Sequence, residues 1–116
     1  MYIAMNRFKV LKDRAADFEN VWFSRESYLH EMQGFVAFHL LKGPEREDHA
    51  LYSSHTVWAS YADFEAWTKS DAFRKAHARA GNGNAQPMTL GHPEFEGFHV
   101  LQEVTPDGAV RRIAAE

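Results

Sequence analysis

The chain of 116 residues contains no cysteine. Disulfide bridges, thiolate metal ligands and cysteine nucleophiles are therefore all excluded. Seven histidines remain, and imidazole is a side chain that both binds metals and exchanges protons near neutral pH. Histidine is thus the leading candidate for any metal or acid–base chemistry in this protein.

Long apolar runs and clusters of basic residues are also missing. No stretch approaches the roughly 18 consecutive apolar residues of a membrane-spanning helix. The formal net charge is −3, and no stripe of Lys and Arg is present to neutralise phosphates, so we expect neither a membrane nor a nucleic acid as a partner. Residues 1–7 lead into strand-like sequence without the apolar segment of a signal peptide. We therefore expect a cytoplasmic protein.

Aromatic residues, in contrast, are plentiful, at 14% of the chain, and 45% of all residues are hydrophobic. This length suits a single globular domain. So many aromatic rings indicate either a well-filled core or an apolar pocket for a large flat ligand, and composition alone does not choose between the two.

The hydrophobic periodicity predicts alternating strands and helices. The predicted strands are residues 2–10, 35–41, 50–59 and 94–104, with a polar turn from Gly43 to His49 and a loop at 81–93. The predicted helices run from near Arg14, capped by Asp13, to Met32, and from Ser60 through Trp67 and Asp71 to about Ala80, with Ser60 and Asp63 resembling a capping box. Residues 1–104 are expected to form one domain, and residues 105–116 a peripheral tail.

The order β-α-β-β-α-β is typical of a ferredoxin-like α+β fold, with a four-stranded antiparallel sheet and two helices on one face. Residues 35–41 are apolar on both faces of their strand. Burial of one such side chain is worth about 1.5–3 kcal/mol, so neither face is cheaply exposed. We therefore expect two sheets to pack together in a homodimer.

His77 lies on the apolar stripe of its predicted helix, together with Phe73, Ala76 and Ala80. The two alanines leave space beside the imidazole that a large planar ligand could occupy. A histidine in such a position is otherwise a satisfied core or interface residue. Spacing alone leaves both interpretations open.

Trp67 precedes His77 by ten residues, which on a straight helix separates them by about 15 Å and about 80° of rotation. Ser70 is a good N-cap and Asp71 suits a first turn. We therefore predict a helix break at Ser70 and Asp71 that lets Trp67 and His77 converge. The alternative is that Trp67 is an ordinary core residue beside Phe64.

Asn6 shares a strand face with Phe8 and Val10, although Asn is depleted in strands. Its amide either bonds to nearby backbone or points an N–H at a ligand in an apolar cavity. His39, His55 and His99 also lie on predicted strands. They lack HExxH or comparable ligand spacing, so we do not expect a separate metal site.

One segment resembles the IsdG-type haem-degrading monooxygenases of the antibiotic biosynthesis monooxygenase superfamily. The matching pattern is Val57-Trp58-Ala59-Ser60, then Phe64-x-x-Trp67-x-Lys69-Ser70-Asp71-x-Phe73-x-x-Ala76-His77. The likeness includes Asn6-Arg7-Phe8 and Gly34-Phe35, covers about residues 3–80, and fades across the loop at 81–93. Other members of the superfamily share the fold, and the combination of Asn, Trp and His marks the haem-degrading group.

The resemblance implies a dimeric α/β barrel that binds haem as both cofactor and substrate. His77 is then the iron ligand, Trp67 presses on the macrocycle and ruffles it, and Asn6 donates a hydrogen bond on the distal side. Dioxygen and an external electron donor or reductase would open the porphyrin at a meso carbon, releasing iron and a linear, biliverdin-like tetrapyrrole. Candidates for contacts with the propionates are Arg25, Arg74, Lys75, Arg79 and His92.

Two other functions stay open at this point. The first is a cofactor-independent monooxygenase of the same superfamily, acting on a phenolic or polyketide-like aromatic substrate. The second is a non-catalytic haem carrier, which would bind haem and leave it intact.

Overall fold

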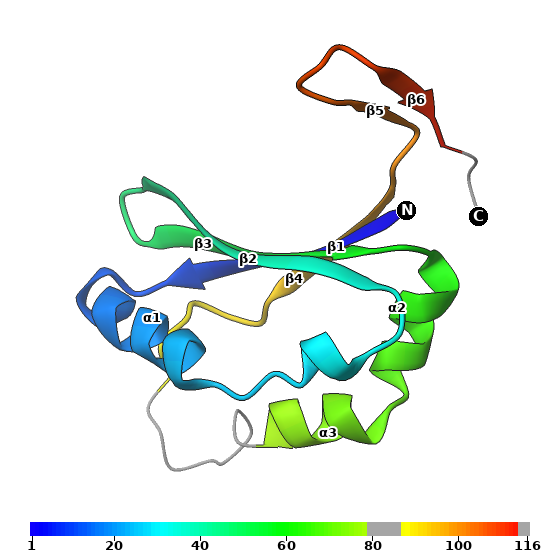
Figure 1. Cartoon of the computed structure of the whole chain (residues 1–116). Coiled ribbons are helices and arrows are strands. Elements are labelled where there is room, and N and C mark those ends of the chain that lie inside the picture. The colour runs from blue at the N-terminus through cyan, green and yellow to red at the C-terminus, as the bar shows by residue number, and fades with distance from the viewer. Residues whose placement is uncertain (79–86, 114–116) are drawn as a thin grey trace.

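A four-stranded antiparallel sheet forms the centre of the protein (Figure 1). The computed structural model describes residues 1–78 and 87–113. The helices lie on one face of the sheet (Figure 1). The strands are β1 (Tyr2–Val10), β2 (Phe35–Glu45), β3 (Ala50–Trp58) and β4 (Glu94–His99), in the spatial order β2-β3-β1-β4. This arrangement confirms the predicted ferredoxin-like α+β fold.

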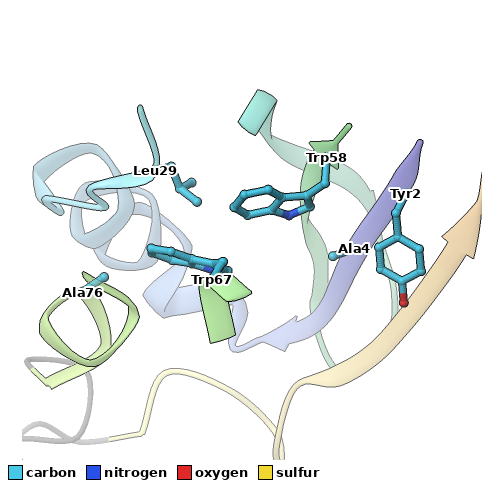
Figure 2. Packing of buried hydrophobic residues seen from close by; sticks show 6 residues of the cluster. All are labelled: Tyr2, Ala4, Leu29, Trp58, Trp67 and Ala76. Atoms are coloured by element: carbon cyan, nitrogen blue, oxygen red, sulfur yellow. The ribbon is translucent and has the colours of Figure 1, made fainter. Parts of the chain in front are cut away.

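Alternate side chains of β1 and β3 point toward the helices and form the core. Tyr2 pairs with Trp58, and Phe8 pairs with Tyr52, across these two strands. One buried cluster contains Tyr2, Ala4, Leu29, Trp58, Trp67 and Ala76 (Figure 2). A second cluster contains Val10, Phe18, Ala50 and Tyr52. The core is therefore divided into two parts along the length of β1.

The first helical region is interrupted, so the prediction of one helix reaching Met32 is wrong. It consists of a 3-10 turn, η1 (Lys12–Arg14), helix α1 (Ala15–Ser24) and a second 3-10 turn, η2 (Leu29–Glu31). The predicted Asp13 cap is also wrong, because Arg14 occupies the N-cap position and makes no side-chain cap hydrogen bond.

The chain between α1 and η2 has non-helical backbone angles. Arg25 is extended, with φ −78° and ψ 131°, and Tyr28 has a left-handed φ of 60°. The Ser27 hydroxyl accepts a hydrogen bond from the Leu29 amide at 3.4 Å, the kind of local bond with which serine competes against the helix. Leu29 therefore reaches the core from a separate turn, η2. Its position in the sequence matches the apolar spacing of a longer α1, although the chain between them is not helical.

Two short helices follow β3. Helix α2 (Tyr61–Thr68) begins after Ser60, whose hydroxyl oxygen accepts a hydrogen bond from the Asp63 amide at 3.1 Å, so the predicted cap is confirmed. Helix α3 (Asp71–Ala78) starts three residues after α2 ends. Within the described residues, no helix has the length and apolar character needed to cross a membrane.

The β2–β3 hairpin is longer than the sequence predicts. β2 continues through Gly43 and Pro44 to Glu45, where a turn is predicted. Since β2 is an edge strand, the missing N–H of Pro44 is tolerated there, between the shifted pairings of Lys42 and Glu45. The turn itself is closed by a hydrogen bond from the Arg46 amide to the His49 carbonyl, at 2.7 Å.

The predicted strand 94–104 is divided in the structure. β4 ends at His99, and β5 (Gln102–Val104) pairs with β6 (Val110–Arg112) in a separate hairpin. This hairpin projects from the sheet on the side opposite the helices (Figure 1). The predicted boundary between domain and tail, at residue 104, falls inside the hairpin.

The predicted loop 81–93 is described from residue 87 onward, and the predicted helix end at Ala80 lies outside the described residues. The Leu11 amide donates to the Met88 carbonyl at 2.8 Å, and the Leu90 amide donates to the Lys9 carbonyl at 2.7 Å. Residues 87–90 are therefore anchored to the end of β1.

The outer face of the sheet, which is the face away from the helices, carries a row of apolar side chains. The strand register places one row across all four strands, made of Ala37, Val57, Ile3 and Phe98. Phe98 is 47% exposed, and Val36 at the start of β2 is 53% exposed. This apolar row is unlike a solvated sheet face, whereas Arg7, Ser53 and Glu94 form a polar row further along the same face.

Gly34 provides a test of the packing between β2 and α2. It has a left-handed φ of 81°, and a Cβ added there would lie 2.0 Å from the Asp63 Oδ2 atom. Gly91 has a similar φ of 76°, but nothing lies within 4 Å of its added Cβ. Both Gly→Ala changes add backbone strain of about 1–2 kcal/mol, and Gly34→Ala adds a steric cost of about 1–3 kcal/mol.

We therefore expect Gly34→Ala to lower the free energy of unfolding more than Gly91→Ala does. Urea denaturation followed by tryptophan fluorescence measures both losses. Equal losses in the two variants would contradict the close approach of Gly34 to Asp63.

Candidate functional site

A cavity of about 860 Å³ lies between the inner face of the sheet and the helices, where the two core clusters meet. Its volume falls within the range of about 300–1,000 Å³ that is usual for small-molecule and cofactor sites. Its walls are largely aromatic and include Phe8, Phe18, Trp22, Phe38, Trp58 and Phe95. Asn6, Trp67 and His77, the three residues predicted from sequence, all line this one cavity.

The predicted helix break is confirmed, and Ser70 makes it. The Ser70 hydroxyl donates to the carbonyl of Trp67 at 2.7 Å, at the end of α2. The same oxygen accepts a hydrogen bond from the Phe73 amide at 3.1 Å, in the first turn of α3. Ser70 thus ends one helix and caps the next.

The break brings Trp67 and His77 to the same side of the cavity. Their ring centroids are 6.4 Å apart, against about 15 Å of axial rise on a straight helix. Trp67 is only 7% exposed and packs against Trp58 and Phe73, at centroid distances of 6.1 and 5.5 Å. Figure 2 shows Trp67 facing Trp58, with Leu29 and Ala76 beside it.

His77 has one ring nitrogen engaged and the other available. Its Nδ1 atom lies 2.7 Å from the Phe73 carbonyl oxygen, which can only accept a hydrogen bond. In the neutral ring, Nδ1 therefore carries the proton and Nε2 has the lone pair. The ring stacks on Phe73 at 4.0 Å, and the side chain is exposed at the cavity wall. A backbone carbonyl that fixes the tautomer in this way is the usual support of a metal-binding histidine.

Asn6 lies on the inner face of β1, between Ser54 on β3 and Phe95 on β4. It is half-buried, and its side chain makes no hydrogen bond to any residue in the described ranges 1–78 and 87–113. The alternative that its amide is tied to nearby backbone is therefore wrong for these residues. The amide has donor and acceptor capacity to offer to a ligand.

Sequence reasoning missed two hydroxyl groups in the cavity floor, those of Ser54 and Thr56. Ser54 is buried and directly opposite Asn6 in the sheet. Both residues share a strand face with the core residues Tyr52 and Trp58, and this parity was the available signal. The floor of the cavity is therefore polar near Asn6, although its walls are apolar.

Among the described residues, Arg25 is the arginine or lysine that lines this cavity. Its guanidinium lies 4.6 Å from the centre of the Trp22 ring, and burial lowers the pKa of Arg25 below its ordinary value. The extended backbone of Arg25 after α1 places it there. This position suits a site for carboxylate groups.

The other predicted cations lie elsewhere. Arg74 pairs with Asp71 on the exposed side of α3, and Lys75 is exposed. His92 lines a separate cavity of about 260 Å³ with Arg7, Lys9, Arg46 and His49. Arg79 lies outside the described residues.

The three strand histidines do not gather into one cluster. His39 and His55 face each other on the outer side of the sheet, with ring centroids 5.7 Å apart. His99 lies beside Tyr2 at 5.1 Å. In the described ranges, no group of three or more His, Cys, Asp or Glu side chains is arranged to hold a metal ion.

Fold and cavity together define a ferredoxin-like α+β protein with a large aromatic pocket and one accessible imidazole in its wall. The family model described as "Antibiotic biosynthesis monooxygenase" matches residues 1–79. The chain belongs to the antibiotic biosynthesis monooxygenase family, as its resemblance to these proteins predicted.

Curated relatives in this family have names that concern haem. A "Heme oxygenase (staphylobilin-producing)" of Staphylococcus haemolyticus is 34% identical over 77 residues, which are 66% of this chain and 73% of that protein. A "Heme-degrading monooxygenase" of Shouchella clausii is 32% identical over 78 residues, 67% of this chain and 70% of that protein.

Solved structures share the fold. The haem degrader MhuD of Mycobacterium tuberculosis, solved with two haems in its active site, has a TM-score of 0.68 and 24% identity, covering 90% of this chain and 100% of that one. SnoaB, a cofactor-independent oxygenase of Streptomyces nogalater, has a TM-score of 0.62 and 25% identity, covering 90% of this chain and 96% of that one.

Proposed function

We propose that this protein is a haem-degrading monooxygenase that binds haem as both cofactor and substrate. It uses dioxygen and electrons from an external donor to open the porphyrin at a meso carbon, and it releases iron and a linear, biliverdin-like tetrapyrrole. One observation carries the proposal: the His77 Nε2 atom is available in the wall of a large aromatic cavity, with its tautomer set by the Phe73 carbonyl. The names of the curated relatives support it.

The residues of the cavity fit haem in size, shape and charge. The volume of about 860 Å³ and the aromatic walls suit a large flat ring system. The neutral imidazole of His77 is a common iron ligand, and Arg25 supplies positive charge for the carboxylates of the porphyrin. Bound haem supplies iron as the centre at which dioxygen is activated.

His77 would hold the iron through Nε2. The hydrogen bond from Nδ1 to the Phe73 carbonyl keeps the lone pair on Nε2 and fixes the plane of the ring, which also stacks on Phe73. Such a supporting bond raises the basicity of the ligand. The side chain therefore needs little rearrangement on binding.

Trp67 is a rigid wall for the macrocycle. Its indole is fixed between Trp58 and Phe73, so it cannot move away from a bound ring without disturbing the core. A macrocycle held by His77 would therefore contact a surface that does not move, and Trp67 would favour distortion of that macrocycle. Macrocycle distortion is one of the means by which a protein tunes haem chemistry.

Asn6 directs a polar group into an otherwise apolar part of the cavity. Its amide N–H would act as the hydrogen-bond donor on the distal side of a bound haem. The hydroxyl groups of Ser54 and Thr56 lie on the same floor and can hold a water or an oxygen atom in place. The walls around them are largely aromatic.

The fold alone does not separate this function from cofactor-independent oxygenation, since SnoaB shares it. The combination of His77 with Trp67 and Asn6 in one cavity favours haem. A haem carrier would use the same ligand but leave the porphyrin intact. Haemin titration followed by addition of ascorbate in air, with catalase present, separates the three functions by the appearance and then the bleaching of the Soret band.

His77→Ala should weaken haemin binding by at least about tenfold, which corresponds to 1.4 kcal/mol, and shift the Soret band, because the axial ligand is lost. Absorption titration measures both effects. His92→Ala, a change in the separate smaller cavity, is the matched control and should leave the titration unchanged. An unchanged ligation spectrum in His77→Ala would assign the iron to another side chain.

Asn6→Ala should retain haemin binding but slow the ascorbate-driven bleaching by about 100-fold, a typical cost of removing one preorganised donor. The rate of Soret decay under saturating haemin gives this number. Asn20→Ala, on the exposed side of α1, serves as the control. Undiminished decay in Asn6→Ala would remove Asn6 from the distal role.

The proposal includes a homodimer in which the outer faces of two sheets pack against each other as a barrel. The exposed row that contains Phe98, together with Val36, supports it, since packing of two sheets would remove this apolar surface from water. Leu101, Val104 and Val110 are also exposed. The β5–β6 hairpin lies on the same side of the sheet as this outer face (Figure 1).

We expect light scattering to give twice the 13.3 kDa mass of one chain for the wild type. Phe98→Ser should shift the protein toward the single-chain mass, because it places a polar side chain in the interface. Phe23→Ser, at a 73% exposed position on α1, is the control and should leave the mass unchanged. A wild type of single-chain mass would exclude the dimer without affecting the haem site.

A further inference from the structure

Four oxidisable aromatic residues follow one another from the cavity to the surface, and Phe64 contacts the rings of the two in the middle, Trp58 and Tyr2. Trp67 lines the cavity, and its ring centroid lies 6.1 Å from that of Trp58. Trp58 is the cross-strand partner of Tyr2, so their Cβ atoms are within about 4.5–5.5 Å of each other. Tyr2 contacts Tyr61 edge-on at 5.0 Å. Figure 2 shows the first three rings in this order.

The first three residues of this path are buried, and the last is partly exposed. Trp67 and Tyr2 are buried, Trp58 is completely buried, and Tyr61 is 39% exposed at the start of α2. The path therefore has one end in the cavity and the other at the solvent. Phe64 also lies between Trp58 and Tyr61, but its ring is far harder to oxidise than indole or phenol.

The surroundings of Trp58 favour transfer of an electron vacancy through this residue and disfavour a long-lived radical on it. Its Nε1 atom is buried and has no hydrogen-bond partner among the residues that the structure describes. An oxidised indole becomes stable when it loses this proton, and no acceptor is at hand for it. An electron vacancy on Trp58 is therefore filled from the next ring, Tyr2. At the surface end of the path, the ring centroid of His99 lies 5.1 Å from that of Tyr2 and 6.1 Å from that of Tyr61.

We propose that Trp67, Trp58, Tyr2 and Tyr61 form a relay that carries oxidising equivalents out of the cavity to the protein surface. The relay rests on the proposed function in one respect, since oxygen chemistry at iron is the source of strong oxidants in the cavity. It adds a protective function: an oxidant that fails to attack the substrate is discharged at the surface instead of modifying the cavity walls.

The relay conserves atoms and electrons. A one-electron oxidant in the cavity takes one electron from the Trp67 indole, and the vacancy passes to Trp58, then to Tyr2 and then to Tyr61. Oxidised Tyr2 releases its phenolic proton to the neighbouring His99 imidazole and takes it back when Tyr61 supplies the electron. Tyr61 ends as a neutral phenoxyl radical after its phenolic proton passes to water or to His99. A one-electron reductant such as ascorbate or a thiol then returns one hydrogen atom to Tyr61 at the surface.

The absence of cysteine from the chain allows the relay to be tested without haem. Thr68 lines the cavity next to Trp67, and Thr68→Cys provides a unique thiol for a ruthenium photosensitiser. Flash oxidation of the attached ruthenium, followed by transient absorption, distinguishes indole radicals from phenoxyl radicals. We expect an indole signal that decays into a phenoxyl signal.

Tyr61→Phe in this labelled protein should abolish the long-lived phenoxyl signal and prolong the indole signal. Tyr2→Phe keeps the ring and removes only the oxidisable hydroxyl, and it should slow the formation of the phenoxyl radical severalfold. Tyr28→Phe is the matched control outside the path and should change neither signal. A phenoxyl signal that persists in Tyr61→Phe, or its unchanged rate of formation in Tyr2→Phe, would overturn the relay.

A second readout uses the haem-loaded protein. After exposure to hydrogen peroxide, peptide mass spectrometry should find more oxidation at Trp67 and Trp58 in Tyr61→Phe than in the wild type or in Tyr28→Phe. Equal oxidation in all three proteins would contradict a protective function. Failure to bind haem would count against the proposed function alone, because the ruthenium experiment does not need it.

Discussion

The hydrogen bonds of Ser70 are the constraint on which the cavity depends. They end α2 and cap α3, so that two helices form in place of one. The ring centroids of Trp67 and His77 are therefore only 6.4 Å apart. The same turn places Phe73 where its carbonyl takes the Nδ1 proton of His77 and its ring stacks on the imidazole. One serine thus sets the position, the tautomer and the orientation of the proposed ligand.

Much of this arrangement could be predicted from the sequence, because it depends on local chemistry. Alternating side chains identified β1 and β3, and the polarity of Ser60 and Ser70 identified two helix starts. The break followed from simple helix geometry applied to Trp67 and His77. The haem assignment came from resemblance, since spacing alone left His77 open as a core residue.

The errors have a common physical origin in contacts that periodicity does not record. Leu29 reaches the core from a 3-10 turn, so its spacing imitates a longer α1. Residues 94–104 contain no proline or turn sequence that separates two strands, yet the chain leaves β1 after His99 and pairs with β6 instead. Arg25 could be selected from the five candidates for propionate contacts only once the end of α1 had placed it in the cavity wall. The strand with which a segment pairs, and the cavity that a side chain lines, depend on tertiary contacts.

Among the residues that the structure describes, the cavity of about 860 Å³ leaves the aromatic side chains in its walls without packing partners on one side. Whatever fills it binds the folded chain and not the unfolded one. At a hundredfold excess over its Kd, such an occupant adds about 2.7 kcal/mol to the folded state. Resistance of the protein to proteolysis in the cell, and hence its abundance, would then rise and fall with the supply of its own ligand.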